Sequence, residues 1–216
     1  MKLEQVKEIA NAVLYEGYLL YPYRQSAMKN RQRWTFGVVY PQAYSLASGE
    51  VEPWFMRTEC LLVAEPEARI TIHARFLHLL VRNTTEKHEI DGNIPARLPA
   101  WQIASNWQPE AREEGVEREI RLPDLQLKAL LAQPVSVKVE YPAWHLEERE
   151  GAEQRLIMRE QRSLAGTLTI SAEPAGAGEQ KDCYKISVHI ENQTPDTATI
   201  KDQRSILLQS FVSTHT

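Results

Sequence analysis

Cysteine is scarce in this chain, and long apolar runs are lacking. Only two cysteines, Cys60 and Cys183, occur among the 216 residues, and they stand far apart and outside any paired-cysteine motif. A disulfide framework and a cysteine-based zinc site therefore have no support. Glu4 and Glu8 interrupt the apolar residues at the start of the sequence, so no export signal is recognisable. We expect a cytoplasmic protein whose two thiols are reduced and buried in strands.

No stretch approaches the roughly 20 apolar residues that a membrane span requires. A basic excess is also lacking, because 25 Lys and Arg stand against 29 Asp and Glu, which leaves a formal net charge of −4. A dedicated nucleic-acid-binding protein usually carries a clustered basic patch. We therefore expect neither a membrane nor a nucleic acid as a partner.

Glycine is also infrequent, with nine residues, and the sequence has none of the glycine-rich motifs that hold phosphates. It has no G-x-S-x-G nucleophile elbow either. The densest groups of carboxylates, REEGVEREI (112–120) and HLEEREGAEQR (145–155), are typical of solvated charge runs. These absences predict a protein that binds no cofactor and is not an enzyme by itself.

The histidines offer little for metal or acid–base chemistry. His73 and His78 are five residues apart in an expected strand, which puts them on opposite faces. His88 lies in a loop that offers no third histidine or cysteine at a metal-binding spacing. His145 has acidic neighbours but no nucleophile next to it. We predict no metal site.

The alternative to a non-catalytic protein is that the chain is part of an enzyme whose active site is completed by a missing C-terminal region or a partner subunit. His73, His88 and His145 are then the residues to test.

The sequence does contain clear periodicity. Residues 3–14 place apolar side chains at helical spacing and predict a short amphipathic helix, and a second helical turn is expected within 124–133. Period-two alternation predicts strands over 33–40, 53–64, 69–83, 116–125, 135–141, 156–174 and 183–195. The stretch from Leu77 to Val81 is apolar on both faces, so we expect it to be covered on both sides. We expect the last two strands, 156–174 and 183–195, to form a hairpin, and the long strand 156–174 to break at Gly166. Residues 142–154 are interpreted as a charged excursion between strands.

These elements predict a mainly β protein, an antiparallel β-sandwich of immunoglobulin-like or C2-like type with a short N-terminal helix. We divide the chain into residues 1–32, which hold the helix and an aromatic and basic segment, and residues 33–216, which form the sandwich. The closing ATIKDQRSILLQSFVSTHT (198–216) is still apolar and strand-like or helical. Either this end is a natural terminus tied down by packing, or the chain is the first part of a longer protein.

The segment LYEGYLLYPYRQSAMKNRQRWTFG (14–37) interleaves aromatic and basic residues. Its tyrosines could continue the helix face and pack on a sheet, its aromatics and arginines could contact another protein, or they could stack on bases. A long irregular stretch, 86–109, adds two tryptophans. The candidate protein-contact residues are Tyr18, Tyr21, Tyr23, Arg24, Arg31, Arg33, Trp34, Trp101 and Trp107.

The block VLYEGYLLYPYRQSAMKNRQRWTFGVVYP (13–41), together with ISVHIENQTP (186–195) and SFVSTHT (210–216), resembles a bacterial protein family encoded in NiFe-hydrogenase gene clusters. The resemblance touches both ends of the chain and is weak in the middle. Members of that family continue past the S-T-H-T element, so the resemblance implies that this chain is its N-terminal portion. It supplies no catalytic residue. It implies an accessory role in assembly, maturation or scaffolding, with hydrogenase subunits or maturation factors as partners.

Together, these patterns favour a non-catalytic accessory or scaffold protein that binds another protein, and they leave self-association open. If segment 14–37 is a docking surface, Arg24→Glu will lose the partner because it reverses a charge among the candidate contacts, whereas His145→Ala will keep it. An affinity pull-down of the tagged protein from its own cells, followed by mass spectrometry, checks this. Recovery of the same partner with Arg24→Glu contradicts the docking role of the segment.

Overall fold

The computed structural model describes residues 3–14, 36–85, 112–150, 155–176, 182–195, 197, 199–200 and 202–216. In chain order the elements are α1 (Leu3–Leu14), α3 (Gln42–Ala47), β1 (Phe55–Val63), β2 (Arg69–Thr85), β3 (Arg112–Gln126), α4 (Leu127–Ala132), β4 (Val135–Tyr141), β5 (Trp144–Glu150), β6 (Arg155–Gln161), β7 (Leu164–Pro174), β8 (Cys183–Asn192), α5 (Gln203–Leu207) and β9 (Val212–His215). None of the described helices is long and apolar enough to cross a membrane.

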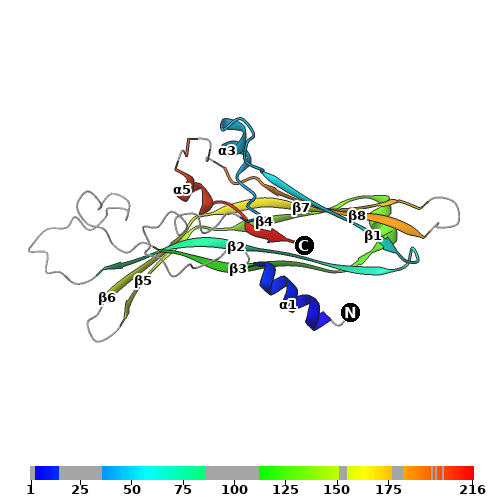
Figure 1. The fold of residues 1–216 in the computed structure, drawn as a ribbon, viewed down its shortest axis with the longest axis horizontal. Helices are drawn as coiled ribbons and strands as arrows, with labels where there is room; N and C mark the ends of the chain where they lie inside the picture. Colours follow the sequence, from blue (N-terminus) through cyan, green and yellow to red (C-terminus); the bar gives the residue numbers. More distant parts are fainter. Residues whose placement is uncertain are drawn as a thin grey trace, which may run out of the picture.

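The strands form two antiparallel sheets that stack face to face (Figure 1). One sheet has four strands in the order β1-β8-β7-β4, and the other has five, β3-β2-β6-β5 with β9 paired to β2. Helix α1 lies on the outer side of the five-stranded sheet, against β2 and β9. The expected mainly β antiparallel sandwich with a short N-terminal helix is confirmed, and so is the hairpin of β7 and β8.

The main core lies between the two sheets. It contains buried side chains from both, among them Ala74, Phe76, Val139, Leu164, Leu168, Ile170, Tyr184, Ile186, Val188, Ile190 and Phe211. The ring of Phe211 stands edge-on to Phe76, with the ring centroids 4.7 Å apart. Gly166 makes room for it, since a Cβ at this position would lie 2.8 Å from Phe211 Cζ and 2.2 Å from the carbonyl oxygen of Glu191.

A second apolar cluster covers the opposite face of β2. Leu77 and Leu79 are fully buried there, against Leu14 of α1 and against Ile206 and Val212 near the C-terminus. The expectation that this part of the strand is covered on both faces is therefore confirmed. Helix α1 forms over the predicted residues, but it is anchored at its end by Leu14, and two of its apolar side chains, Val6 and Ile9, are exposed.

Asn192, at the end of β8, joins three segments that are distant in sequence. Its side chain is fully buried, and its amide Nδ2 donates to the carbonyl oxygens of Val39 and Gln209, each at 2.9 Å. Its Oδ1 accepts from both the backbone N–H and the hydroxyl of Thr194. Every hydrogen-bonding group of this amide is thus satisfied, which is the condition for burying one without a large desolvation cost.

Three expectations about individual segments were wrong. The charged excursion expected over 142–154 instead contains strand β5, and the run 145–155 supplies all of β5 except Trp144, together with the first residue of β6. The long strand breaks at Arg162 and Ser163, where the chain changes sheets, and Gly166 lies inside β7. Both cysteines are free, but Cys60 is exposed and Cys183 only half-buried, since their side chains sit at the edge strand and the end of the four-stranded sheet.

Gly166→Ala should lower the stability of the fold by about 1–3 kcal/mol or more, because the added methyl group would overlap backbone and the Phe211 ring. Urea denaturation followed by circular dichroism measures this. Thr167→Ala is the matched control, since Thr167 is only half-buried and its hydroxyl bonds the exposed Gln193. An unchanged midpoint for Gly166→Ala would show that the sheet relaxes around the methyl group.

Candidate functional site

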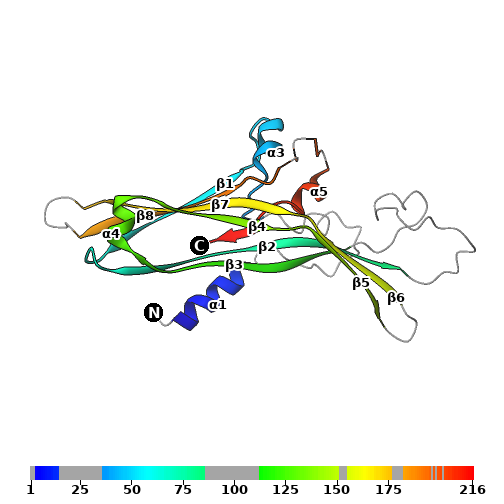
Figure 2. The ribbon, with the colours of Figure 1, turned by 180° about the vertical axis from the view of Figure 1, so that it is seen from behind.

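Part of the five-stranded sheet continues past the sandwich. Strand β6 pairs with β5 on one side and with the end of β2 on the other, and none of the three pairs there with the four-stranded sheet. Figures 1 and 2 show the β5–β6 hairpin projecting beyond the stacked sheets. We call β5, β6 and the adjoining residues 80–85 of β2 and 112–116 of β3 the arm. Its inner face continues the core-facing side of the sheet, and its outer face continues the side that carries α1.

The arm begins where two consecutive strands cross from one sheet to the other. Strand β4 ends at Tyr141 and β5 starts at Trp144, directly beside the point where β6 ends at Gln161 and β7 starts. Gln161 is fully buried at this bend. Its Oε1 accepts from Trp144 Nε1 at 2.8 Å and from Arg118 Nη2 at 2.9 Å, while its Nε2 donates to the carbonyl oxygen of His78 at 3.1 Å. One amide therefore joins β2, β3, β5 and β6.

His78 is fully buried beside this amide, and its Nε2 lies 3.0 Å from the carbonyl oxygen of Arg162. Burial, helped by the nearby Arg118 guanidinium, lowers the pKa of His78 to about 4, although the carbonyl groups of Arg162 and Leu208 act in the opposite direction. The ring is therefore neutral at pH 7. The Arg118 guanidinium also lies over the ring of Tyr141, 4.6 Å from its centroid.

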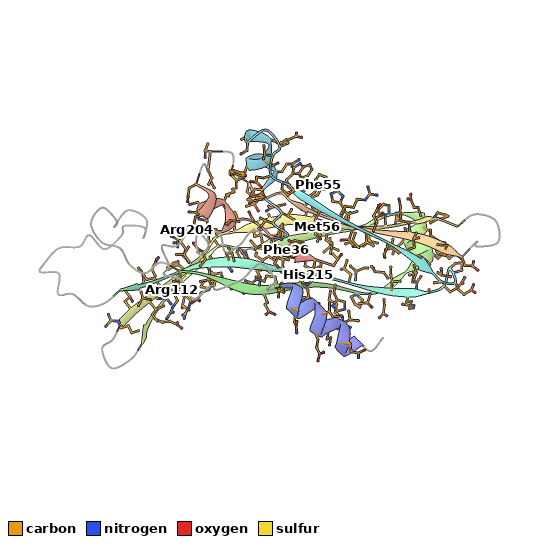
Figure 3. The ribbon with its side chains drawn as sticks, viewed as in Figure 1. Phe36, Phe55, Met56, Arg112, Arg204 and His215 are labelled. Carbon is orange, nitrogen blue, oxygen red and sulfur yellow. The ribbon has the colours of Figure 1, made fainter. Side chains whose placement is uncertain are left out.

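Three arginines lie in one cross-strand row on the inner face of the arm. Arg82 of β2 stands opposite Arg112 of β3 on one side and opposite Arg159 of β6 on the other. Like charges directly opposite one another in a sheet repel. Glu114 moderates this repulsion, with carboxylate oxygens 3.7 Å from Nε of both Arg82 and Arg159. Figure 3 labels Arg112 where the arm leaves the sandwich.

An exposed apolar pair lies beside this row. Trp144 and Leu146 follow each other on the inner face of β5, 36% and 43% exposed, and Leu146 stands directly opposite Arg159. Glu148, which pairs with Arg159, is the next residue on this face. The inner face thus combines tryptophan, leucine and arginine, a composition typical of protein-binding hot spots and of interface cores.

The outer face of the arm has the opposite charge. Its acidic side chains, placed by the strand register, are Glu113, Glu147 and Glu160. Arg149 accompanies them on β5, and Arg204 of α5 pairs with Glu113. The two faces of the arm therefore differ in the sign of their charge, although the whole chain is acidic.

The candidate contacts predicted from the sequence lie elsewhere. Tyr18, Tyr21, Tyr23, Arg24, Arg31, Arg33, Trp34, Trp101 and Trp107 all fall outside the described residues, as does His88. They stay predictions.

The two described histidines of the enzyme alternative are not brought together. His73 pairs with Glu119 on the outer face of the five-stranded sheet. His145 lies on the arm, at a register position eight residues further along β2, or about 26 Å. Within the described ranges, no group of three or more His, Cys, Asp or Glu side chains could hold a metal ion.

The structure does bring together parts of the sequence blocks on which the family resemblance rests. Val39 and Phe211 exchange backbone hydrogen bonds, and Thr214 N donates to the carbonyl oxygen of Gly37 at 2.9 Å. Gly37 has φ +54°, and a Cβ there would lie 3.1 Å from the Thr214 backbone, so this contact requires glycine. Asn192 completes the junction through Val39.

Sequence reasoning missed Gln161, Arg118 and the arginine row. A weak signal was present, because Arg112, Glu114 and Arg118 recur at even spacing within the charge run that forms β3. That spacing places them on one strand face, but only the register of three strands shows that Arg82 and Arg159 join them.

Comparison of the chain with protein-family models, curated proteins and solved structures finds no match in any of the three.

The neutral His78 makes stability depend on pH. Its pKa of about 4 in the folded state lies below the ordinary value of 6.5, so between these values the unfolded chain binds a proton that the folded chain does not. Folding stability should therefore fall as the pH drops from 6.5 to 4, by up to about 3 kcal/mol from this group. Urea denaturation at pH 7 and pH 4.5 measures the difference. It should shrink in His78→Gln and persist in His145→Gln, and equal pH dependence in all three proteins would contradict this origin.

Proposed function

We propose that this protein is a non-catalytic accessory protein that binds another protein through the inner face of the arm. The observation that carries this proposal is the arginine row beside exposed Trp144 and Leu146, on strands without a second sheet over them in the described part of the chain. Tryptophan and arginine supply much of the binding energy in protein interfaces. The buried amide of Gln161 fixes the strands that carry them, so little order is lost on binding.

The charges on this face favour a partner with an acidic surface. Among the described side chains, Arg82, Arg112 and Arg159 of this face, with Arg118 next to it on β3, stand beside two glutamates, Glu114 and Glu148. Arginine binds carboxylates through paired, planar hydrogen bonds. An acidic protein surface with an apolar centre would therefore match both the arginines and the apolar pair.

The resemblance of the N-terminal block to proteins encoded with NiFe hydrogenases supports hydrogenase subunits or maturation factors as the partner class. The role we propose is then assembly or maturation of that enzyme. Arg24 and the other candidate contacts of segment 14–37 would extend the contact surface beyond the arm.

Arg112→Glu and Leu146→Asp should each weaken partner binding by about tenfold or more, because each removes a contact and places a negative charge against an acidic partner. The tagged variants are compared with the wild type by pull-down from the source cells, with quantitative mass spectrometry of the recovered proteins. Binding should also weaken as the salt concentration rises.

Arg149→Glu is the matched control. It makes the same charge change on the same hairpin but on the outer face, and the side chain is exposed. Equal loss of the partner in Arg149→Glu and Arg112→Glu would overturn the inner face as the binding surface. Recovery of nucleic acid in place of protein would overturn the class of partner. Recovery of acidic proteins unrelated to hydrogenases would overturn only the hydrogenase assignment.

A further inference from the structure

Strand β1 forms one edge of the four-stranded sheet, and its second edge pairs with no strand among the described residues. Asn192 N donates to the carbonyl oxygen of Trp54, and Ala64 N donates to that of Asp182, so the even-numbered residues of β1 bond to β8. In an antiparallel ladder the backbone groups of the intervening residues point away. The N–H and C=O groups of the odd-numbered residues 55 to 63 therefore face the free edge. Tyr40 N bonds the carbonyl oxygen of Pro53, so this edge opens after Pro53.

This edge lacks three of the features with which proteins often block strand pairing, and its two charges, Arg57 and Glu59, are of opposite sign. Exposed edges commonly carry lysine, proline or a bulge. Strand β1 has none of these, and its register with β8 runs without a shift from Phe55 to Val63. Strand β4, the other edge of the same sheet, differs: it has the exposed Lys138 and a proline directly before and after it. Leu61 and Val63 on β1 are 69% and 79% exposed.

The outward-facing side chains of β1 form a self-complementary series. In chain order they are Phe55, Arg57, Glu59, Leu61 and Val63, and Pro53 precedes them two residues before Phe55. Read in the opposite direction with Pro53 included, the series again shows two apolar residues, a charged pair and two apolar residues. A second copy running antiparallel, with Thr58 opposite the partner's Thr58, places Arg57 opposite the partner's Glu59 and Phe55 opposite the partner's Leu61. The two-fold axis repeats both pairs.

Charge also excludes the neighbouring registers. Centring the pairing on residue 57 would set Arg57 against the partner's Arg57, and centring it on residue 59 would set two glutamates against each other. If the two-fold axis lay between two residues, odd-numbered residues would pair with even-numbered ones. Backbone groups that point to the free edge would then oppose groups that point toward β8. Centres at Met56 or Cys60 would satisfy the backbone but set Arg57 and Glu59 opposite apolar residues. Of these registers, the one centred on Thr58 satisfies the backbone and also pairs each charge with its opposite. Arg57 and Glu59 already lie 2.6 Å apart within one chain, so the four charges of a pair of chains would alternate in sign.

From this we infer that β1 is the contact through which two copies of the chain associate, as antiparallel strands paired about Thr58. The two four-stranded sheets would then join into one continuous sheet, and residues 55 to 61 of each copy would form the new ladder. Phe55 is held in place for this contact because its ring stacks on His189, with the centroids 5.1 Å apart. Figure 3 labels Phe55 and Met56 at the start of the strand. The contact uses a different sheet from the arm and does not depend on the function proposed for it.

Thr58→Cys tests the register in a chain whose natural cysteines are changed to serine. Thr58 would face the partner's Thr58 in a pair without backbone hydrogen bonds, where the Cα atoms lie about 4.5 Å apart and a disulfide can form. Mild oxidation should therefore give a covalent dimer on a non-reducing gel. Ser136→Cys in the same background, on the edge strand β4, should not cross-link. The natural Cys60 should not cross-link to its copy either, since this register separates the two by about 13 Å.

Charge reversal tests the same contact in solution. Arg57→Glu should weaken dimerisation by about tenfold or more, measured by sedimentation equilibrium, because each reversal acts at both symmetric pairs. The double variant Arg57→Glu, Glu59→Arg should restore it. Circular dichroism confirms that each variant is folded. A wild-type chain that stays monomeric at about 100 μM, well above the Kd of a functional dimer, would overturn the inference. Cross-linking of Ser136→Cys as readily as Thr58→Cys would also overturn it.

Discussion

The buried side-chain amide of Gln161 is the contact on which the shape of this protein depends. Two strands leave one sheet and enter the other at this point, and a bend of this kind leaves backbone and side-chain polar groups without ladder partners. Gln161 satisfies the Trp144 indole, the Arg118 guanidinium and the carbonyl oxygen of His78 at once. Because an unsatisfied buried polar group costs roughly 1–3 kcal/mol, these bonds define the bend closely. The direction of the arm, and so the orientation of its two faces, follows from that bend.

The distribution of charge matters more than its total. The chain carries a formal net charge of −4, yet among the described side chains of the arm arginines outnumber glutamates on the inner face and glutamates outnumber arginines on the outer one. Ionic contacts at exposed positions contribute little to stability. The same side chains can instead select a partner and its orientation, because electrostatic complementarity acts mainly on specificity and on the rate of association. On the edge strand β1, one charged pair between apolar residues would likewise select the partner strand and its register.

Prediction from the sequence succeeded where one strand face was apolar. Strands β4 and β8 alternate cleanly, and both were predicted with their inward faces correct at Val139 and Ile186. It failed for residues 112–115 of β3 and for β5, because charged residues occupy both faces there and the period of two disappears from the hydrophobicity pattern. The candidate site shows the same limit. Aromatic and basic composition drew attention to segment 14–37, whereas the row of Arg82, Arg112 and Arg159 comes from residues up to 77 positions apart that only strand register brings together.

By itself, the sequence determined the class of the fold, the helix at its start, most of the strands and the double covering of β2 near Leu77. These depend on local periodicity, which neighbouring residues encode directly. The tertiary structure alone decided where a strand changes sheets, which strand edges have no partner among the described residues and which charges become neighbours. Those features depend on pairing between distant segments and on how one buried amide is satisfied, and neither leaves a periodic trace along the chain.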